Sequence, residues 1–480
     1  MSYSDVQLFI GGKWGPGGEG LAMDVLNPAT EQMIGKVAVA TKSDLDAALE
    51  SAQLGFEEWG AMSAYTRSNI LRNAAIILRE RADMIAGILT LEQGKPLAQA
   101  KAEVLAGAEF IEWSAEEARR TYGLVIPARN AEVLQLTLRE PVGPVAAFAP
   151  WNFPINQCVR KLAAGLAAGC SFVLKGPEDT PGSPAELVRA FVDAGVPGNT
   201  INLVYGDPPM ISGHLIPHRV IRKISFTGST QVGRQIGAMA ASHMKRMTLE
   251  LGGHAPVIVA EDADIEAAVK FMVLQKFRNG GQVCTSPTRF LVQQKVFDRF
   301  VEKFVKQCAE LVVGDGLDPA TEMGPLINRK RVDSVSELVD EAVSLGAKLC
   351  TGGNRIANKG FFYAPTVLTN VPIAARIMNE EPFGPVALIN PFNTLDEALE
   401  EANRLEFGLA SYAFAGSAAT VAKLGKGIAA GMVSINHLGL ALPEVPFGGI
   451  GDSGVGTEGG AEAVAQFLAT KFVTQQTIGG

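Results

Sequence analysis

Between Pro144 and Ala260 the chain alternates between short apolar runs and segments with helical spacing. This alternation predicts a parallel sheet that is covered by helices on both faces. Ligands of such sheets bind beyond the carboxyl ends of the strands, so we expect functional residues there. The expected strands span Val145–Ala149, Ser171–Lys175, Ile201–Val204 and Lys223–Thr227, and helices are expected up to Ala168, over Pro184–Ala194 and after Thr227.

A second alternating region runs from Ala255 to about Ser453. The chain has 480 residues, more than one hydrophobic core normally serves, so two or more domains are expected. We predict two α/β layers with a cleft between them. Ahead of the first layer, residues 8–40 are predicted to form short strands and turns, and residues 41–121 amphipathic helices, the first of them capped by Ser43.

Two pieces of the chain outside these layers alternate between apolar and polar residues. They are Ala131–Thr137 and, near the C-terminus, Lys471–Thr474. A period of two is typical of a half-buried strand. We therefore expect these strands to pair with each other or with another subunit.

The composition argues against several classes of protein. The net charge is −8, with 42 basic and 50 acidic residues, so the chain lacks the basic footprint of a nucleic-acid-binding protein. It has no apolar run of 18 residues and no signal-like start, and we expect neither membrane insertion nor export. Its five cysteines lack CxxC spacing, which argues against a disulfide framework and a metal site and favours the cytoplasm.

One cysteine lies in a sequence that does not look like core. Cys284 belongs to Arg278–Ser286, a stretch of small and polar residues after a predicted helix at Asp264–Phe277. A cysteine that serves only packing usually lies inside an apolar periodic run. Glu250, 34 residues earlier, lies between two leucines and precedes two glycines. These two features alone fit a reactive pair and a chance pair equally well.

Two further motifs follow predicted strands. Lys175–Glu178 follows one strand, and Phe226–Gly233 follows another and opens a helix. Glycines at 228 and 233 would let the backbone approach a ligand, and the helix N-terminus would attract a phosphate. The spacing is not the GxGxxG fingerprint, so an ordinary strand-to-helix turn is an alternative.

Six motifs occur in order along nearly the whole chain, and together they resemble those of the NAD(P)-dependent aldehyde dehydrogenase superfamily. Six motifs in register are specific, so the resemblance favours functional roles for Cys284 and Glu250 over a chance pair. The motifs are Pro150–Pro154, Lys175–Glu178, Phe226–Thr230, Glu250–Gly253, Gly281–Cys284 and Glu381–Pro385.

The resemblance implies an aldehyde dehydrogenase-like α/β fold, with two Rossmann-like domains and a small β oligomerisation element. Residues 1–120 and 140–252 would form the NAD(P)-binding domain, and residues 253–455 the catalytic domain that carries the thiol. Residues 121–139 and 456–480 would form the oligomerisation element. A homodimer or homotetramer is therefore expected.

The resemblance also implies catalytic roles that suit the residue types. Oxidation of an aldehyde needs a tetrahedral adduct that can expel hydride, and a thiolate forms one by covalent attack. Cys284 is the expected nucleophile. Asn152 and the backbone N–H of the cysteine are expected to hold the oxyanion, although an asparagine kept only for the turn is the alternative. Glu250 is expected to activate the water that hydrolyses the thioester, because apolar neighbours raise the pKa of a carboxyl group.

The cofactor contacts implied by the resemblance are of three kinds. Lys175 and Glu178 match contacts to the adenosine ribose, Ser229 a contact to the pyrophosphate, and Glu381 and Phe383 contacts to the nicotinamide half. A carboxylate at Glu178 would repel a 2′-phosphate, so NAD is expected, with NADP as the alternative because Lys175 offsets part of the repulsion. Further cofactor contacts are expected from Trp151, Phe226 and Gly228.

Two arginines, Arg160 and Arg278, flank the expected cleft. This pattern resembles succinate-semialdehyde and α-ketoglutarate-semialdehyde dehydrogenases, in which paired arginines hold the distal carboxylate of the substrate. The planar guanidinium suits the role because it binds a carboxylate through two hydrogen bonds. Gln157 and Ser286 are also expected to contact the substrate.

Three alternatives stay open at this point. The arginines would have a structural role if they paired with acidic side chains, and the substrate would then be an uncharged aliphatic or aromatic aldehyde. A member that had lost catalysis would be a structural or binding protein, but Cys284 and Glu250 are both present. Pro443–Glu444 is more similar to the α-ketoglutarate-semialdehyde group, so the length of the substrate is open.

Overall fold

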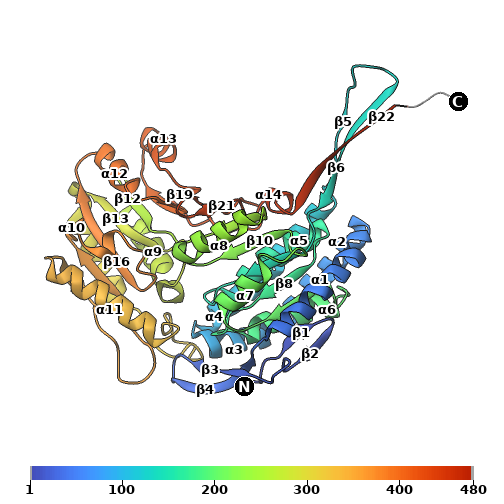
Figure 1. Cartoon of the computed structure of the whole chain (residues 1–480). Coiled ribbons are helices and arrows are strands. Elements are labelled where there is room, and N and C mark those ends of the chain that lie inside the picture. The colour runs from blue at the N-terminus through green and yellow to red at the C-terminus, as the bar shows by residue number, and fades with distance from the viewer. Residues whose placement is uncertain (1–2, 477–480) are drawn as a thin grey trace.

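The computed structural model describes residues 3–476, which fold around two large sheets (Figure 1). The first sheet has the strand order β2-β1-β9-β8-β7-β10-β11-β21. Its five central strands are parallel, as predicted, and the outer strands β1, β2 and β21 run antiparallel to their inner neighbours. The bounds are β1 (Leu8–Ile10), β2 (Lys13–Gly15), β7 (Val145–Phe148), β8 (Phe172–Lys175), β9 (Ile201–Val204), β10 (Lys223–Thr227), β11 (Arg246–Glu250) and β21 (Gly454–Val455).

The central strands of this sheet are buried on both faces. Every residue of β7, β8, β9 and β10 is buried, which explains their unbroken apolar sequences. Helix α1 packs against β8 and β9, and α8 packs against β10 and β11. The helices are α1 (Lys42–Ala61), α2 (Ala64–Glu80), α3 (Ala82–Gln93), α4 (Leu97–Ala118), α5 (Pro154–Ala168), α6 (Gly182–Asp193), α7 (Pro208–Leu215) and α8 (Thr230–Ser242).

The cap of the first helix differs from the prediction. Thr41, not Ser43, is the N-cap of α1. The Thr41 hydroxyl accepts a hydrogen bond from the Asp44 backbone N–H, and the Asp44 carboxylate accepts one from the Thr41 backbone N–H. In this reciprocal capping box, Asp44 supplies the acceptor side chain three residues after the cap.

The second sheet forms the second predicted layer. Its strand order is β14-β15-β16-β13-β12-β18-β19, and β14 alone runs antiparallel to its neighbour. Its strands are β12 (Ala255–Val259), β13 (Pro287–Gln293), β14 (Lys348–Thr351), β15 (Thr366–Thr369), β16 (Val386–Phe392), β18 (Ala410–Phe414) and β19 (Met432–Ile435). Its helices are α9 (Ile265–Phe277), α10 (Gln294–Ala309), α11 (Arg329–Ser344), α12 (Leu395–Ala402) and α13 (Ala418–Gly427). The predicted α/β class is confirmed.

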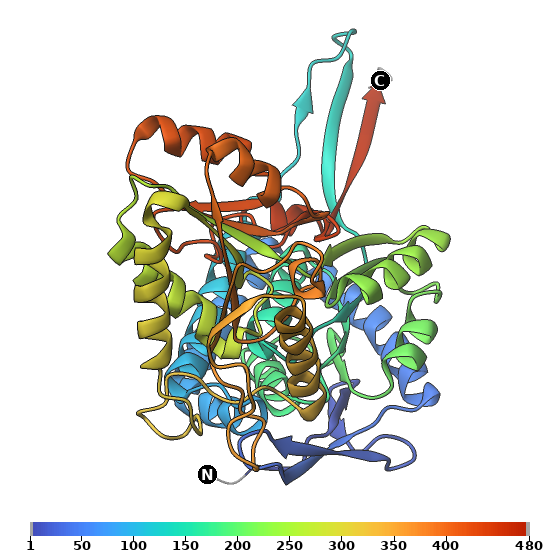
Figure 2. The ribbon, with the colours of Figure 1, turned by 90° about the vertical axis from the view of Figure 1, so that its left-hand side faces the viewer.

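A three-stranded antiparallel arm projects from the body of the molecule (Figure 1, Figure 2). Strand β22 (Leu468–Gln476) pairs over its full length with β6 (Val133–Pro141), so the predicted pairing of the two alternating pieces is confirmed. Strand β5 (Val125–Ile126) adds a short outer edge. The arm exposes apolar side chains, among them Val125 at 76% and Phe472 at 55%.

The remaining elements are small. They are the hairpin of β3 (Ala22–Asn27) and β4 (Gln32–Ala38), the pair of β17 (Phe407–Gly408) and β20 (Ile450–Gly451), the turn η2 (Arg376–Met378), and α14 (Glu462–Ala465). Across residues 3–476, every helix is too short or too polar to cross a lipid bilayer.

Candidate active site

A cavity of about 670 Å³ lies at the carboxyl ends of β7, β10 and β11. Residues that follow these strands line one side, including Asn152 and Ser229. Cys284, Glu381 and Phe383, from the second alternating region, also line it. The cavity therefore occupies the position where the sequence predicts a cleft.

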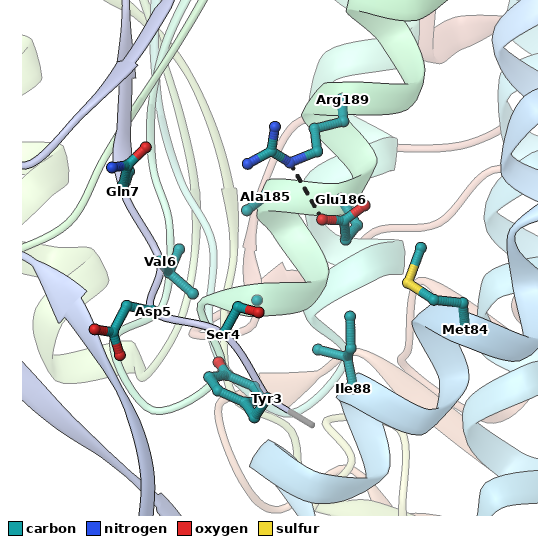
Figure 3. A pocket seen from close by; sticks show the side chains of 11 residues that line it. Tyr3, Ser4, Asp5, Val6, Gln7, Met84, Ile88, Ala185, Glu186 and Arg189 are labelled. Atoms are coloured by element: carbon teal, nitrogen blue, oxygen red, sulfur yellow. Dashed lines mark ion pairs between the residues drawn. The ribbon is translucent and has the colours of Figure 1, made fainter. Parts of the chain in front are cut away.

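A second hollow, of about 240 Å³, lies between the N-terminal segment and helices α3 and α6 (Figure 3). Its lining includes Tyr3, Met84 and Ile88, together with an ion pair in which Nε of Arg189 lies 3.2 Å from Oε1 of Glu186. None of the residues predicted for catalysis, cofactor or substrate lines this hollow. The larger cavity is therefore the candidate active site.

Cys284 is held in the cavity wall by a turn that requires glycine. The η1 turn (Arg278–Gly281) precedes it and has positive φ from its second to its fourth residue. A Cβ atom on Gly281 would lie 2.1 Å from the carbonyl oxygen of Gly384, so a side chain is excluded there by space as well as by φ. Beyond the cysteine, the Tyr412 hydroxyl donates to the carbonyl of Thr285 over 2.8 Å and fixes the chain.

The Cys284 thiol is protonated at neutral pH in this environment. Burial and, after it, the carboxylates of Glu381 and Glu250 raise its pKa to about 12, and Arg160 opposes the shift. The thiolate is the nucleophilic form of cysteine. Attack by Cys284 therefore requires loss of the thiol proton.

Glu250 is the last residue of β11, so it lies at the carboxyl end of a parallel strand. It is buried, and among residues 3–476 neither carboxyl oxygen has a hydrogen-bond partner. Burial raises the pKa of Glu250 well above its ordinary value, and the Glu458 carboxylate adds to the effect while Lys161 and Arg160 oppose it. Buried carboxyl groups are normally hydrogen-bonded, and one without partners suits a group that takes up and releases protons.

Asn152 lies in the cavity wall with a defined amide orientation. Its Nδ2 donates to the carbonyl oxygen of Gln282 over 3.0 Å. A carbonyl oxygen only accepts, so the nitrogen of the amide must face it. The amide has a second N–H, which is available for a ligand oxygen beside the cysteine.

Two buried charges beside Glu250 were not singled out from the sequence. Nζ of Lys161 lies 2.7 Å from Oε1 of Glu458 and 2.5 Å from Oγ1 of Thr227. Lys161 lies in α5, where every residue except Asn156 is buried. The available indication of this pair was the position of Lys161 in a helix that is buried on all sides. A charge at such a position needs a buried partner.

The two predicted substrate arginines, of which Arg160 is buried and Arg278 half-buried, lack acidic partners among residues 3–476. The Arg160 guanidinium lies 4.1 Å from the ring centroid of Phe110 and 4.2 Å from that of Phe447, so aromatic rings pack against it. Arg278 lies over the Phe153 ring at 5.4 Å. Within residues 3–476 neither arginine forms an ion pair, and Nη1 of Arg160 and Nε of Arg278 lack hydrogen-bond partners. The structural alternative, pairing with acidic side chains, does not occur in this part of the chain.

The other two predicted substrate residues are placed differently. Gln157 lines the cavity, and its Oε1 is buried without a partner among the described residues. Ser286 does not line the cavity. Its hydroxyl accepts a hydrogen bond from Nζ of Lys276 over 3.1 Å, and burial lowers the pKa of this lysine to about 7. Lys276 is another buried charge that the sequence analysis did not single out.

The predicted cofactor residues fall into two groups. Glu381 faces the cavity, and its Oε1 accepts a hydrogen bond from the Gly253 backbone N–H over 3.1 Å. Burial raises the pKa of Glu381 to about 7. The rings of Trp151 and Phe383 meet edge to face, with centroids 5.7 Å apart. The residues that line the cavity are Trp151, Gly228, Ser229, Glu381 and Phe383, and those outside its lining are Lys175, Glu178 and Phe226.

The second group, Lys175, Glu178 and Phe226, lies near the ends of β8 and β10 but outside the cavity lining. Nζ of Lys175 lies 2.5 Å from Oε2 of Glu178, whose other oxygen accepts a hydrogen bond from the backbone N–H of Gly206. Phe226 packs so closely that a Cβ atom on Gly228 would lie 2.5 Å from its ring. Gly228 is followed by Ser229, the N-cap of α8, so this helix N-terminus opens at the cavity.

Residues 14–473 match the sequence model of the aldehyde dehydrogenase family. The chain belongs to this family. It is 45% identical to putative 4-(hydroxymethyl)benzenesulfonate dehydrogenase TsaD2 of Comamonas testosteroni, with 98% of each chain covered. It is 41% identical to succinate-semialdehyde dehydrogenase [NADP(+)] GabD of Escherichia coli, with 98% of this chain and 99% of the relative covered. A crystal structure of an E. coli NADP-dependent enzyme superposes with a TM-score of 0.96 at 40% identity, with 98% of each chain covered.

This aldehyde dehydrogenase uses NAD or NADP, as its family does. The residues at the cavity suit a dinucleotide. The N-terminus of α8, reached past a glycine, would suit phosphate oxygens, and the half-buried carboxyl of Glu381 would suit ribose hydroxyls. When bound, the cofactor would accept the hydride that leaves the substrate carbon.

Proposed function

We propose that this aldehyde dehydrogenase oxidises an aldehyde with an anionic group at its far end, most simply succinate semialdehyde or α-ketoglutarate semialdehyde. The observation that supports this proposal is the pair of unpaired arginines. Arg160 is buried and Arg278 half-buried, and both lack acidic partners in the described chain and lie within electrostatic range of Cys284. A buried charge without a partner is costly, and a substrate anion would supply that partner.

The chemistry of the anion is supported by the names of similar proteins. One relative is named for succinate semialdehyde, and others for glutarate semialdehyde, 3-sulfolactaldehyde and 4-(hydroxymethyl)benzenesulfonate. A carboxylate and a sulfonate share oxygens that accept two hydrogen bonds from one guanidinium. The aromatic rings of Phe110 and Phe447 at Arg160 give a specific reason to include an aryl sulfonate as the second candidate.

The proposed reaction begins at Cys284. The Cys284 thiol loses its proton to solvent, and the thiolate attacks the aldehyde carbon to form a thiohemiacetal. The second N–H of Asn152 and the Cys284 backbone N–H hold the oxyanion. Departure of hydride leaves a thioester. Glu250 then takes a proton from water as the water attacks, and the acid and the free thiol are released.

The cofactor and assembly proposals follow the sequence analysis. We propose that the first layer binds the dinucleotide, with NAD preferred, and that the second layer, with residues 253–455, carries the nucleophile. We also propose that the arm joins subunits into a homodimer or homotetramer, because its apolar side chains are exposed in one chain. A cytoplasmic location stays a prediction.

One substrate panel tests the proposal. Succinate semialdehyde, α-ketoglutarate semialdehyde, 4-formylbenzenesulfonate, butanal and benzaldehyde would be compared by NADH absorbance, each with NAD and NADP. We expect the anionic aldehydes to have the higher kcat/KM values. Equal or higher values for the uncharged aldehydes would overturn the assignment of a distal anion while leaving the aldehyde dehydrogenase activity intact.

A further inference from the structure

We propose that a buried ion pair, Lys95 with Glu103, is a positioning device for the Asn152 amide. This inference rests on the proposed role of Asn152 in holding the oxyanion. Nζ of Lys95 lies 2.6 Å from Oε2 of Glu103 and 2.8 Å from the backbone carbonyl oxygen of Asn152. The side chains of both members of the pair are 1% exposed. The Lys95 ammonium also lies 4.0 Å from the ring centroid of Phe153, the next residue along the chain.

The other oxygen of Glu103 holds the far end of the same turn. Oε1 accepts hydrogen bonds from the backbone N–H groups of Ile155 at 3.0 Å and Asn156 at 3.3 Å. These N–H groups belong to the first turn of α5 and have no partner within the helix. The ion pair therefore holds the chain on both sides of the bend, at Asn152 through the lysine and at the start of α5 through the glutamate.

Further hydrogen bonds to Asn152 come from the turn before Cys284. Together with the Lys95–Glu103 pair they form what we call the clamp. Nδ2 of Asn279 donates to the Asn152 carbonyl oxygen over 2.9 Å, and the Asn152 side chain donates to the carbonyl of Gln282 over 3.0 Å. Asn152 is thus held from one side by Lys95, in the loop between α3 and α4, and from the other by the turn before Cys284. Its amide keeps one orientation relative to the sulfur, which is what stabilisation of a developing oxyanion requires.

The pair is not the only support of this part of the fold. The loop that carries Lys95 is attached independently, because the backbone N–H of Leu97 donates to the carbonyl of Gly316 over 2.9 Å. Pro154 at the first position of α5 preorganises the start of that helix. Buried ion pairs often contribute little net stability, so removal of both charges together should leave the protein folded while the amide loses its alignment.

The test compares two reactions of the same thiol. Acylation of Cys284 by p-nitrophenyl acetate forms a tetrahedral oxyanion, which then expels p-nitrophenolate. Alkylation by iodoacetamide forms the S–C bond as iodide leaves, without an oxyanion. The variant is Lys95→Met/Glu103→Gln, in which the glutamine oxygen still accepts from the start of α5. We expect its acylation rate to fall about 10- to 100-fold, and its alkylation rate to stay within about twofold of wild type.

Two reference variants complete the design. Asn152→Ala shows the full effect of losing the amide. Arg289→Met/Glu401→Gln removes another buried ion pair, of 3.1 Å, whose residues do not line the cavity, and it should leave the ratio of the two rates unchanged. Melting temperatures confirm folding, and Lys95→Arg, which keeps the charge opposite Glu103 but not the single ammonium that contacts both Glu103 and the Asn152 carbonyl, is used if the double variant at 95 and 103 does not fold.

Each outcome distinguishes the proposed clamp from the proposed oxyanion role of Asn152. A lowered acylation-to-alkylation ratio in both Asn152→Ala and the Lys95/Glu103 variant supports the clamp. A lowered ratio in Asn152→Ala alone overturns the clamp and leaves the proposed function standing. An unchanged ratio in Asn152→Ala overturns the oxyanion role of Asn152 and, with it, the clamp.

Discussion

Nζ of Lys175 lies 2.5 Å from Oε2 of Glu178, so the two side chains predicted to bind the adenosine ribose bind each other. Glu178 also accepts a hydrogen bond from the Gly206 backbone N–H through Oε1. The carboxylate is therefore held in place, and its charge is partly neutralised by the lysine. A 2′-phosphate would meet a weaker repulsion here than at a free glutamate.

We expect the enzyme to prefer NAD by a moderate factor in kcat/KM. Lys175→Met should increase this preference, because the carboxylate then repels a 2′-phosphate without compensation. Glu178→Gln should shift the preference toward NADP. Initial rates with both cofactors measure the effect, and a clear preference of the wild-type enzyme for NADP would show that the placement of Glu178 is wrong.

Replacing Arg160 or Arg278 with alanine should remove charge-assisted hydrogen bonds of about 1.5–3 kcal/mol, or roughly ten- to a hundredfold in kcat/KM for anionic aldehydes. Uncharged aldehydes should lose much less. Lysine should rescue only in part, since it keeps the charge but lacks the planar fork.

Arg299→Ala is the matched control for these variants, because Arg299 is an exposed arginine on α10. It should behave as wild type with every substrate. Equal losses for anionic and uncharged aldehydes in the Arg160 and Arg278 variants would mean that these arginines support the fold or the cofactor and do not recognise the substrate.

Glu250→Gln should separate the two halves of the reaction. Thioester hydrolysis loses its base, so NADH should form in a rapid burst of up to one equivalent and then slowly. Stopped-flow absorbance at the NADH band records both phases. Absence of the burst would place the function of Glu250 before hydride transfer, at removal of the thiol proton.

The high pKa of Cys284, about 12, has a measurable consequence in the free enzyme. The thiolate fraction, and with it the rate of alkylation by iodoacetamide, should rise about tenfold for each pH unit between pH 7 and pH 9. Glu381→Gln removes a negative charge that raises the pKa of the cysteine, so it should accelerate alkylation, and Arg160→Ala should slow it. A rate that levels off below pH 8 would contradict this environment for the thiol.

The sequence predicted the strands of the first sheet well because they are continuous apolar runs separated by helices of ordinary length. The sequence also indicated the enzyme family, through motifs that are local in the chain and that include Cys284 and Glu250. The structure places both of them at one end of that sheet, where Glu250 ends β11. The sequence did not identify the N-cap of α1 correctly, because serine and threonine are both good helix caps. The hydrogen bonds between Thr41 and Asp44 decide which of them is the cap.

The buried lysines were harder to predict. A lysine in a helical segment normally faces solvent, and the partners of these lysines are distant: Glu458 lies 297 positions after Lys161. Lys95 and Glu103 are only 8 positions apart, but the carbonyl that the lysine contacts, that of Asn152, lies 57 positions away. Only tertiary contacts offset the free-energy cost of burying such charges, and a local sequence pattern does not contain those contacts.

The arm also sets the order in which the molecule is completed during synthesis. Nη1 of Arg139 on β6 donates to Oγ1 of Thr470 on β22 across 331 positions, and β22 is the last strand along the described residues 3–476. Every strand of the two large sheets precedes β22 in the chain, so both sheets can form before β22 emerges. A nascent chain therefore carries β6 with one unpaired edge until β22 has been made, and subunits that join through the complete arm can do so only after that point.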